Sequence, residues 1–417
     1  MVIAFTYMMW FMYLEEIQGQ FVRSTEWIFL QIKVPRANLV STLAVENIFA
    51  QMHTVHRTLT FAEKYIEGKF QLWYSLELVS FGGKVSFILR IPARNKNAVE
   101  SAFYSQYPEA EISVTEDYLK GFAYDPQKPS DYDIFGTEFK IRDHTSIPLK
   151  TYKDFEHTTA EEKVIDPLSN IFLTLERLQP HEFVGIQMLI QPIQDDEWRE
   201  KAFTKIRELT GEEEPHKASF INFLLAPFNW FASLSYKESL LGGAGHGAHA
   251  NEQENKPRNN WLSMTEGEKE RVTLIEKKVH KAAYQVKIRH LYIAPKDKFD
   301  KSTKFEVIGA YRHLGSGYHN TLKTDKRIWT KVDPYFSPGL ERPILEWKTN
   351  ERKRWFMKGY KNRSMYVGSP KFILNIEEIA TLYHFPITTE TSLVSSAIDR
   401  TASKKSQPPV DLPIAEI

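Results

Sequence analysis

The sequence predicts an α+β protein with two tandem ferredoxin-like (βαββαβ) modules, the second of them split by an insertion. Three observations support this prediction: a strand–proline–helix pattern that occurs four times, a two-residue hairpin signal, and helices with clear capping residues. Proline closes a strand naturally because it cannot donate a hydrogen bond to the ladder. The four strand–proline segments are IFLQIKVPR (28–36), VSFILRIPAR (85–94), VGIQMLIQPIQ (184–194) and VKIRHLYIAPK (286–296).

The first module is predicted to span 24–120. Its first strand is followed by a helix whose apolar residues recur every four positions. Gly82-Gly83 then separates two alternating apolar runs, a pattern typical of a two-residue hairpin. A short helix and a last strand complete the βαββαβ order. The defining residues are Val40, Ala44, Ile48 and Met52 in the first helix, Val99, Ala102 and Phe103 in the second, and Ala110, Ile112 and Val114 in the last strand.

The second module is predicted to span 135–385. Asp166-Pro167 makes a helix cap and first turn, and the helix that follows carries Leu168, Ile171, Phe172 and Leu175 on one side. Its two middle strands are expected at 183–191 and 284–293. The last helix begins after Asn375, with Glu378 completing a capping box, and Pro386 stops it.

An insertion at 195–280 separates the two middle strands of this module. It is expected to hold a helix with Trp198, Ala202 and Ile206, a flexible linker at about 241–262, and a helix entered at Thr265 and capped by Glu268. It also contains SFINFLLAPFNWFASL (219–234), which has no charge. This segment is interpreted as a hydrophobic hairpin that docks on a partner or a bilayer, or as a core element beneath the second module.

The two ends of the chain differ from the modules. Residues 386–417 have no helical or strand period and are expected to be a disordered tail. The segment 1–23 begins with VIAFTYMMWFMYL (2–14), which would form about 20 Å of helix, less than the roughly 30 Å of a bilayer core. We interpret it as part of a membrane helix or an interfacial anchor, with Trp10, Phe11 and Tyr13 at the membrane. A core or oligomer-contact helix is the alternative.

Composition excludes several classes of protein. The 54 basic and 53 acidic side chains exclude a nucleic-acid footprint that covers the whole chain. The absence of cysteine excludes disulfides and cysteine-ligated metals, and it fits a cytosolic environment.

No enzyme signature is found, and we predict no catalytic residue, metal or cofactor. FGGKVS (81–86) is a hairpin turn rather than a phosphate-binding loop, and GGAGHG (242–247) neither follows a strand nor opens a helix. His53 and His56 have a ligand-like spacing but no third ligand can be placed beside them. His246 and His249 lie in the glycine-rich linker.

One local charge cluster stands out, KTNERKRWFMKGYKNRSMY (348–366), with seven basic residues and one acidic residue. Cations interleaved with aromatic rings suit nucleic-acid binding or anionic head groups. The alternative is a helix that buries its aromatic rings and leaves its cations in water. Lys323, Lys326, Arg327 and Lys331 could enlarge the patch. The candidate binding residues are Arg352, Lys353, Arg354, Trp355, Lys358, Lys361 and Arg363.

Several collinear segments together resemble a known family. They are EWIFLQIKVPR (26–36), ELVSFGG (77–83), QYPEAEI (106–112), the run from KTY (150–152) to DPLSNI (166–171), VKIRHLYIAPK (286–296) and LNIEEIATLYHFP (374–386). They resemble the membrane-proximal, non-motor region of bacterial type IV secretion (conjugation) coupling-protein ATPases. The resemblance covers most of 24–410, and KKSQPPVDLP (404–413) is similar to the junction with the motor domain.

The resemblance implies a non-catalytic, membrane-associated component at the cytoplasmic face of the cell membrane. Its partners would be a separate coupling-protein-type P-loop ATPase, the membrane and DNA or protein cargo, and homo-oligomers are compatible with it. ATP hydrolysis is not implied, because the motor residues are absent from this chain. The alternatives are a stand-alone nucleic-acid or anionic-lipid binding module that uses 348–366, and an enzyme whose site is assembled from loops.

Overall fold

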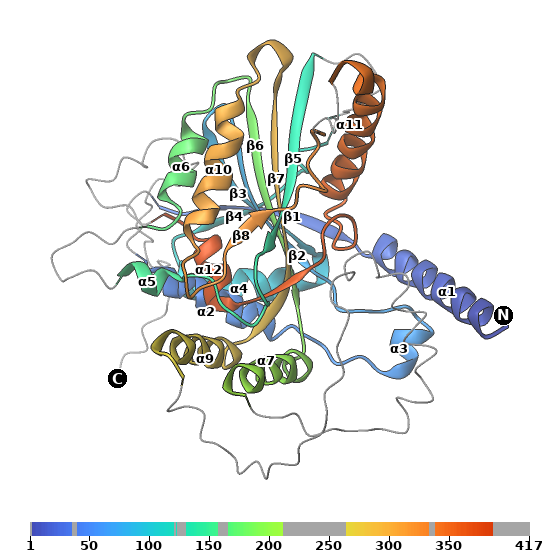
Figure 1. The fold of residues 1–417 in the computed structure, drawn as a ribbon, viewed down its shortest axis with the longest axis vertical. Coiled ribbons are helices and arrows are strands. Elements are labelled where there is room, and N and C mark those ends of the chain that lie inside the picture. The colour runs from blue at the N-terminus through green and yellow to red at the C-terminus, as the bar shows by residue number, and fades with distance from the viewer. Residues whose placement is uncertain are drawn as a thin grey trace, which may run out of the picture.

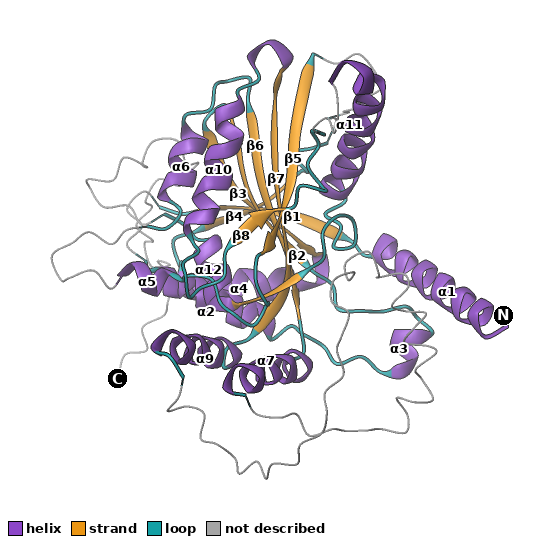
Figure 2. Cartoon of the chain, in the orientation of Figure 1, coloured by secondary structure: helices purple, strands orange, loops and turns teal. Residues whose placement is uncertain are grey.

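The computed structural model describes residues 2–35, 40–120, 122, 131–156, 166–211, 264–332 and 338–386. In these residues the chain forms a mixed α+β fold around one nine-stranded antiparallel sheet (Figures 1 and 2). The strand order is β4-β1-β3-β2-β6-β7-β5-β8, and β9 pairs with β7 off this path. The α+β class predicted from the sequence is therefore confirmed.

The first half of the chain contributes four strands in the order β4-β1-β3-β2, and each neighbouring pair is antiparallel. Its elements are α1 (Val2–Ser24), β1 (Trp27–Lys33), α2 (Thr42–His53), α3 (Phe61–Tyr65), β2 (Tyr74–Phe81), β3 (Lys84–Pro92), a 3-10 turn (Ala93–Asn95), α4 (Lys96–Gln106) and β4 (Glu111–Thr115).

The second half adds β6-β7-β5-β8 and β9, again all antiparallel. Its elements are β5 (Tyr132–Ile141), α5 (Tyr152–Glu156), α6 (Ser169–Glu176), β6 (Phe183–Pro192), α7 (Asp195–Thr210), α9 (Glu266–Val279), β7 (Ala283–Pro295), a 3-10 turn (Lys296–Lys298), α10 (Lys301–His313), β8 (Leu322–Thr324), α11 (Pro338–Lys361), β9 (Phe372–Asn375) and α12 (Ile376–Leu382).

The two halves join through β2 and β6, which pair antiparallel from Tyr74 and Ile190 to Phe81 and Phe183. The sheet is thus continuous across the predicted module boundary. The largest core cluster also contains residues of both halves, for example Leu76 of β2 and Tyr284 of β7.

Several local predictions are confirmed. β3, β6 and β7 end at Pro92, Pro192 and Pro295, and β1 ends two residues before Pro35. Gly82 and Gly83 have φ values of 54° and 87°, the left-handed conformation that a tight hairpin turn requires and that glycine adopts without strain. Capping boxes form at Thr265 with Glu268 and at Asn375 with Glu378.

The two faces of the sheet are covered differently. Alternate residues of β6 show this, because Val184, Ile186 and Met188 pack in the large core cluster with α2, α4, α6, α10 and α12. Phe183 and Leu189 point to the opposite face. There Phe183 packs with residues of α11, and Leu189 packs with Val22 in the last turns of α1, which we call the base of α1. Both helices lie on one side of the sheet in Figure 1.

Three sequence predictions lie outside the described residues. They are the apolar segment 219–234, the linker at about 241–262 with His246 and His249, and the tail after Pro386.

Candidate functional site

Helix α1 exposes an uncharged apolar surface around its whole circumference. Every residue from 5 to 13 is exposed, and Phe5, Met8, Met9, Phe11 and Met12 are each more than half exposed. Figure 1 shows this part of α1 pointing away from the sheet. Contiguous exposed apolar area of this kind marks a binding surface for a protein or a membrane.

The polar second half of α1 fixes the helix to the body. Val22 packs with Trp27, Phe70 and Trp73 beside Leu189 of the sheet. Arg23 forms an ion pair with Glu16 at 2.8 Å along the helix surface. The exposed apolar half of α1 is therefore carried by a second half that is anchored to the sheet.

Helix α3 lies beside α1 and enlarges its exposed surface. Trp10 stacks on Tyr65 with 6.2 Å between ring centroids, and Phe61 and Ile66 are 73% and 64% exposed. We call this set the α1–α3 apolar surface. It contains the predicted membrane-contact residues Trp10, Phe11 and Tyr13, which are 46%, 58% and 44% exposed. Among the helices that the structure describes, none is both long and apolar enough to span a bilayer.

The basic segment forms most of α11, which packs on the second face of the sheet through Phe356, Met357 and Tyr360. Two glycines of the sheet leave room for its rings. A Cβ on Gly136 would lie 2.3 Å from the Phe356 ring, and one on Gly185 would lie 2.1 Å from the Tyr360 hydroxyl. The aromatic residues at 356 and 360 are thus core residues, as the alternative reading of this segment predicted.

The seven candidate binding residues are divided by this packing. Trp355 is 58% exposed, and Arg354 and Lys358 are also exposed. Lys353 pairs with Asp133 of β5, Arg352 donates to the Trp329 carbonyl at 3.2 Å, and Lys361 donates to the Phe122 carbonyl. The structure therefore brings Arg354, Trp355 and Lys358 together at the surface and ties the other candidates to the fold.

Arg363 is the clearest departure from the predicted set, because it is 1% exposed and faces the sheet. Its guanidinium donates to Glu77, to Asp117 and to the Lys361 carbonyl. Burial lowers its pKa, but Glu77 and the other partners raise it overall, so the group stays charged. An arginine whose donors are all directed into the fold cannot also bind a phosphate.

A buried polar row underlies α11 and crosses four strands in register. Glu77 of β2 is opposite Gln187 of β6, Gln187 is opposite Arg289 of β7, and Arg289 is opposite Glu138 of β5. Arg289 donates to Glu138 at 2.7 Å and to Gln187 at 3.2 Å. Its remaining donors reach the carbonyl of Gly359 in the last turn of α11 and the carbonyls of Ser364 and Val367 just after the helix. The row thus holds α11 on the sheet.

A cavity of 360 Å³ lies beside the exposed part of α11. Arg327, Arg352 and Trp355 line it, together with Phe356 and Gly368. This places Arg327, which we predicted as an extension of the patch, next to α11. Arg327 itself forms an ion pair with Asp325 at 2.9 Å.

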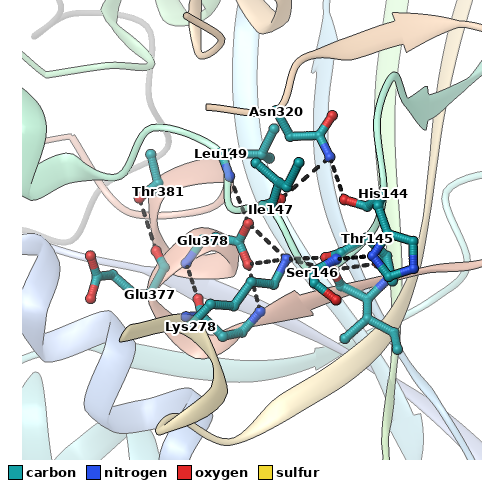
Figure 3. A network of polar contacts seen from close by, with 12 residues as sticks. His144, Thr145, Ser146, Ile147, Leu149, Lys278, Asn320, Glu377, Glu378 and Thr381 are labelled. Atoms are coloured by element: carbon teal, nitrogen blue, oxygen red, sulfur yellow. Dashed lines mark hydrogen bonds and ion pairs between the residues drawn. The ribbon is translucent and has the colours of Figure 1, made fainter. Parts of the chain in front are cut away.

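A second buried network joins α9 to α12 (Figure 3). Lys278 donates to the carbonyls of Thr145 and Ile373 and forms an ion pair with Glu378 at 3.0 Å. Glu378 also accepts from the Leu149 amide at 2.8 Å. Burial lowers the pKa of Lys278 and raises that of Glu378. These groups are saturated by the chain itself, and we assign them to anchoring.

The described residues contain no cluster of three or more His, Asp or Glu side chains that could hold a metal ion. The rings of His53 and His56 stack at 6.2 Å, and His53 Nε2 lies 3.1 Å from the Ile193 carbonyl.

The profile described as "Domain of unknown function (DUF8128)" matches residues 13–394. The chain belongs to the DUF8128 family. No curated protein matches it. The matched residues include both halves of the sheet, α11 and the second half of α1.

The buried polar row of this DUF8128 member was not predicted from the sequence. Its signal was a charged residue inside a strand, Glu77 in LWYSLELVSF and Arg289 in VKIRHLYIAPK, where Lys287 and His290 are also polar. Strand alternation would place each of them on a solvent-facing side. Only the packing of α11 over that side converts them into buried partners.

Proposed function

We propose that this protein is a non-catalytic scaffold held at a membrane surface by its α1–α3 apolar surface. The observation that carries the proposal is the uninterrupted exposure of residues 5–13 of α1, which include Trp10, Phe11 and Tyr13. Water is a poor environment for such a helix, because each large apolar side chain gains about 1.5–3 kcal/mol on burial. Trp and Tyr favour the level of the lipid head groups.

The scaffold in this proposal consists of two ferredoxin-like modules joined edge to edge. The first half has its strands in the order fourth-first-third-second, and the second half has β8-β5-β7-β6, which is the same order. This is the arrangement of a split βαββαβ unit. Pairing of β2 with β6 would then make one rigid platform from two units.

We further propose that the platform positions a coupling-protein-type P-loop ATPase, supplied as a separate protein, together with its DNA or protein cargo. The support for this part is the sequence resemblance to the non-motor region of conjugation coupling proteins. A scaffold at the cytoplasmic face of the cell membrane would hold such a motor close to the membrane.

Vesicle flotation tests the membrane part. The full chain is expected to float with phosphatidylcholine vesicles, and the double variant Trp10→Ser/Phe11→Ser to bind roughly 100-fold more weakly, since two apolar anchors are lost. The matched control is Leu43→Ser/Tyr104→Ser, because these side chains are 47% and 41% exposed on helices of the opposite sheet face. A wild-type chain that stays at the bottom, or an α1 variant that floats normally, would refute the anchor.

A pull-down tests the partner part. The tagged chain is purified in mild detergent from its native membrane fraction, and the proteins that accompany it are identified. A P-loop ATPase that is lost when the tagged chain is omitted supports the proposal. Recovery of the chain without an ATPase would contradict it and leave the membrane anchor unaffected.

A further inference from the structure

Helix α11 carries an exposed stripe that its packing on the sheet does not use. Each of its residues has another three, four or seven positions away, which are the spacings that place side chains on one side of a helix. Ile344, Trp347 and Trp355 are 56%, 61% and 58% exposed. We define the α11 stripe by these residues and by Lys348, Glu351 and Lys358, which lie on the same side.

The cations of the stripe stand beside its aromatic rings. Lys348 and Lys358 are exposed, and the Lys358 ammonium lies 5.3 Å from the centre of the Trp355 ring. Arg354 is adjacent and forms an ion pair with Glu351 at 3.0 Å. Among the described residues, neither Lys348 nor Lys358 is held by an ion pair. The stripe therefore combines apolar rings with positive charge.

The stripe and the α1–α3 apolar surface lie on the same side of the sheet. The base of α1 packs beside Leu189 and α11 packs over Phe183, and both residues belong to the same face of β6. Tyr366, just after α11, is 59% exposed and contacts Phe70 and Trp73 near the base of α1. The exposed Tyr366 ring therefore links the end of α11 to the aromatic residues that hold the base of α1.

We infer that the α11 stripe is a second membrane contact, which binds the anionic head groups of the bilayer. This inference rests on the proposed function of α1. Tryptophan rings favour the interface between head groups and acyl chains, and lysines are attracted to the phosphates of anionic lipids. The α11 stripe presents both kinds of side chain. The stripe would set the orientation of the scaffold on the bilayer, since α1 alone would allow rotation about its own axis.

The location of the rings favours a bilayer over single-stranded nucleic acid. Nucleic acid is held by a groove that follows its backbone with cations along it. Here the inner cations Arg352, Lys353, Lys361 and Arg363 are engaged by the fold. Both arginines that line the cavity beside α11 are also engaged, Arg327 by Asp325 and Arg352 by the Trp329 carbonyl.

Flotation with two vesicle compositions tests the inference. Wild-type chain is expected to bind vesicles rich in phosphatidylglycerol more tightly than pure phosphatidylcholine vesicles. The variant Lys348→Glu/Lys358→Glu should bind the anionic vesicles at least about tenfold more weakly. Each lysine near an anionic surface raises the affinity about fivefold, and its replacement by glutamate also adds repulsion. It should bind phosphatidylcholine vesicles as wild type does.

Lys277→Glu/Lys298→Glu is the control, since it makes the same change in net charge at two exposed lysines away from α11. It should keep the preference for anionic vesicles. Equal binding of wild type to both compositions, or an unchanged preference in the α11 variant, would overturn the inference while leaving the α1 anchor standing. Wild type that binds neither composition would instead refute the proposed function.

A third arm separates lipid from nucleic acid. Binding of a fluorescent oligothymidylate is followed by anisotropy at increasing salt. Weak binding that is equal in wild type and in the α11 variant supports the lipid assignment. Salt-sensitive binding that is lost in the α11 variant, with vesicle binding unchanged, would overturn the assignment in favour of nucleic acid.

Discussion

The Arg363 guanidinium donates to the Glu77 carboxylate from Nε at 3.0 Å and from Nη2 at 3.3 Å. The two residues are separated by 286 positions in the sequence, and both are fully buried. Arg363 sits where α11 ends, with φ at 49°, and Ser364 N–H donates to the Gly359 carbonyl at 3.0 Å. This is the left-handed helix stop that glycine usually provides. Here the bonds of Arg363 to β2 hold a non-glycine residue in that conformation.

Replacement of Arg363 should therefore lower stability. Arg363→Gln leaves Glu77 buried without its cation, which typically costs 3–5 kcal/mol, so about that loss in the free energy of unfolding is expected in urea titrations. The matched control is Arg354→Gln on the same helix. Its partner Glu351 is partly exposed, and surface pairs contribute about 0–1 kcal/mol. Equal losses in the two variants would contradict the buried role of Arg363.

The two glycines beneath α11 should be intolerant of a methyl group. Gly136→Ala and Gly185→Ala place a Cβ within 2.3 Å of Phe356 or 2.1 Å of Tyr360, and overpacking of this kind typically costs about 1–3 kcal/mol. In contrast, a Cβ on Gly309 of α10 would meet nothing within 4 Å. Gly309→Ala should stabilise by up to about 1 kcal/mol through helix propensity. Thermal unfolding of the three variants checks this order.

His290 should make the fold sensitive to acid. It is fully buried, neither ring nitrogen has a partner among the described residues, and burial lowers its pKa to about 3. Unfolded chain takes up a proton near pH 6.5, but the folded chain does not until about pH 3, so stability present above pH 6.5 is lost as the pH falls between these values. His290→Leu should flatten this part of the stability–pH curve. An unchanged slope would contradict the prediction, because it would mean that His290 takes up its proton at the same pH in the folded and the unfolded chain.

His384 should act in the opposite direction. Its Nδ1 lies 2.9 Å from the Ala380 carbonyl and its Nε2 lies 3.0 Å from the Asp166 carboxylate, so both nitrogens face acceptors and the imidazolium form satisfies them. Burial lowers its pKa, but Asp166 and the backbone carbonyls raise it on balance.

The stability that this pair contributes is fully present below about pH 6.5 and is lost as the pH rises through the folded pKa. Unfolding of His384→Gln, measured from weakly acidic to alkaline pH, should lack this decline. Titration of the ring by NMR gives an independent readout. A folded pKa below the unfolded value would contradict the assignment.

The local elements could be predicted because their signals are local. Gly82-Gly83, the capping residues Asn375 and Thr265, and the prolines that end β3, β6 and β7 each act within a few residues. The sequence left open whether Trp10, Phe11 and Tyr13 contact a membrane or pack in a core, and the structure places all three at the surface.

The binding patch could be predicted only in part. Seven cations and their neighbouring rings are visible in 348–366, but helical spacing alone does not tell which side of α11 meets the sheet. Gly136 and Gly185, which lie more than 170 positions away, make that choice by leaving room for Phe356 and Tyr360. Trp355 and Lys358 then face outward, and Arg363 is directed inward.

By itself, the sequence determined the α+β class, the hairpin at Gly82-Gly83, the capped starts of α9 and α12, the strand ends at proline and the absence of charge in the first half of α1. These features depend on short-range propensity and periodicity. Only the tertiary structure decided that β2 and β6 join the two halves and that Glu77, Gln187, Arg289 and Glu138 form one buried row. It also separated the cations of 348–366 into those engaged by the fold and those exposed to solvent. The physical reason is that a charged side chain is buried or exposed according to the elements that pack against it. Those elements come from distant parts of the chain.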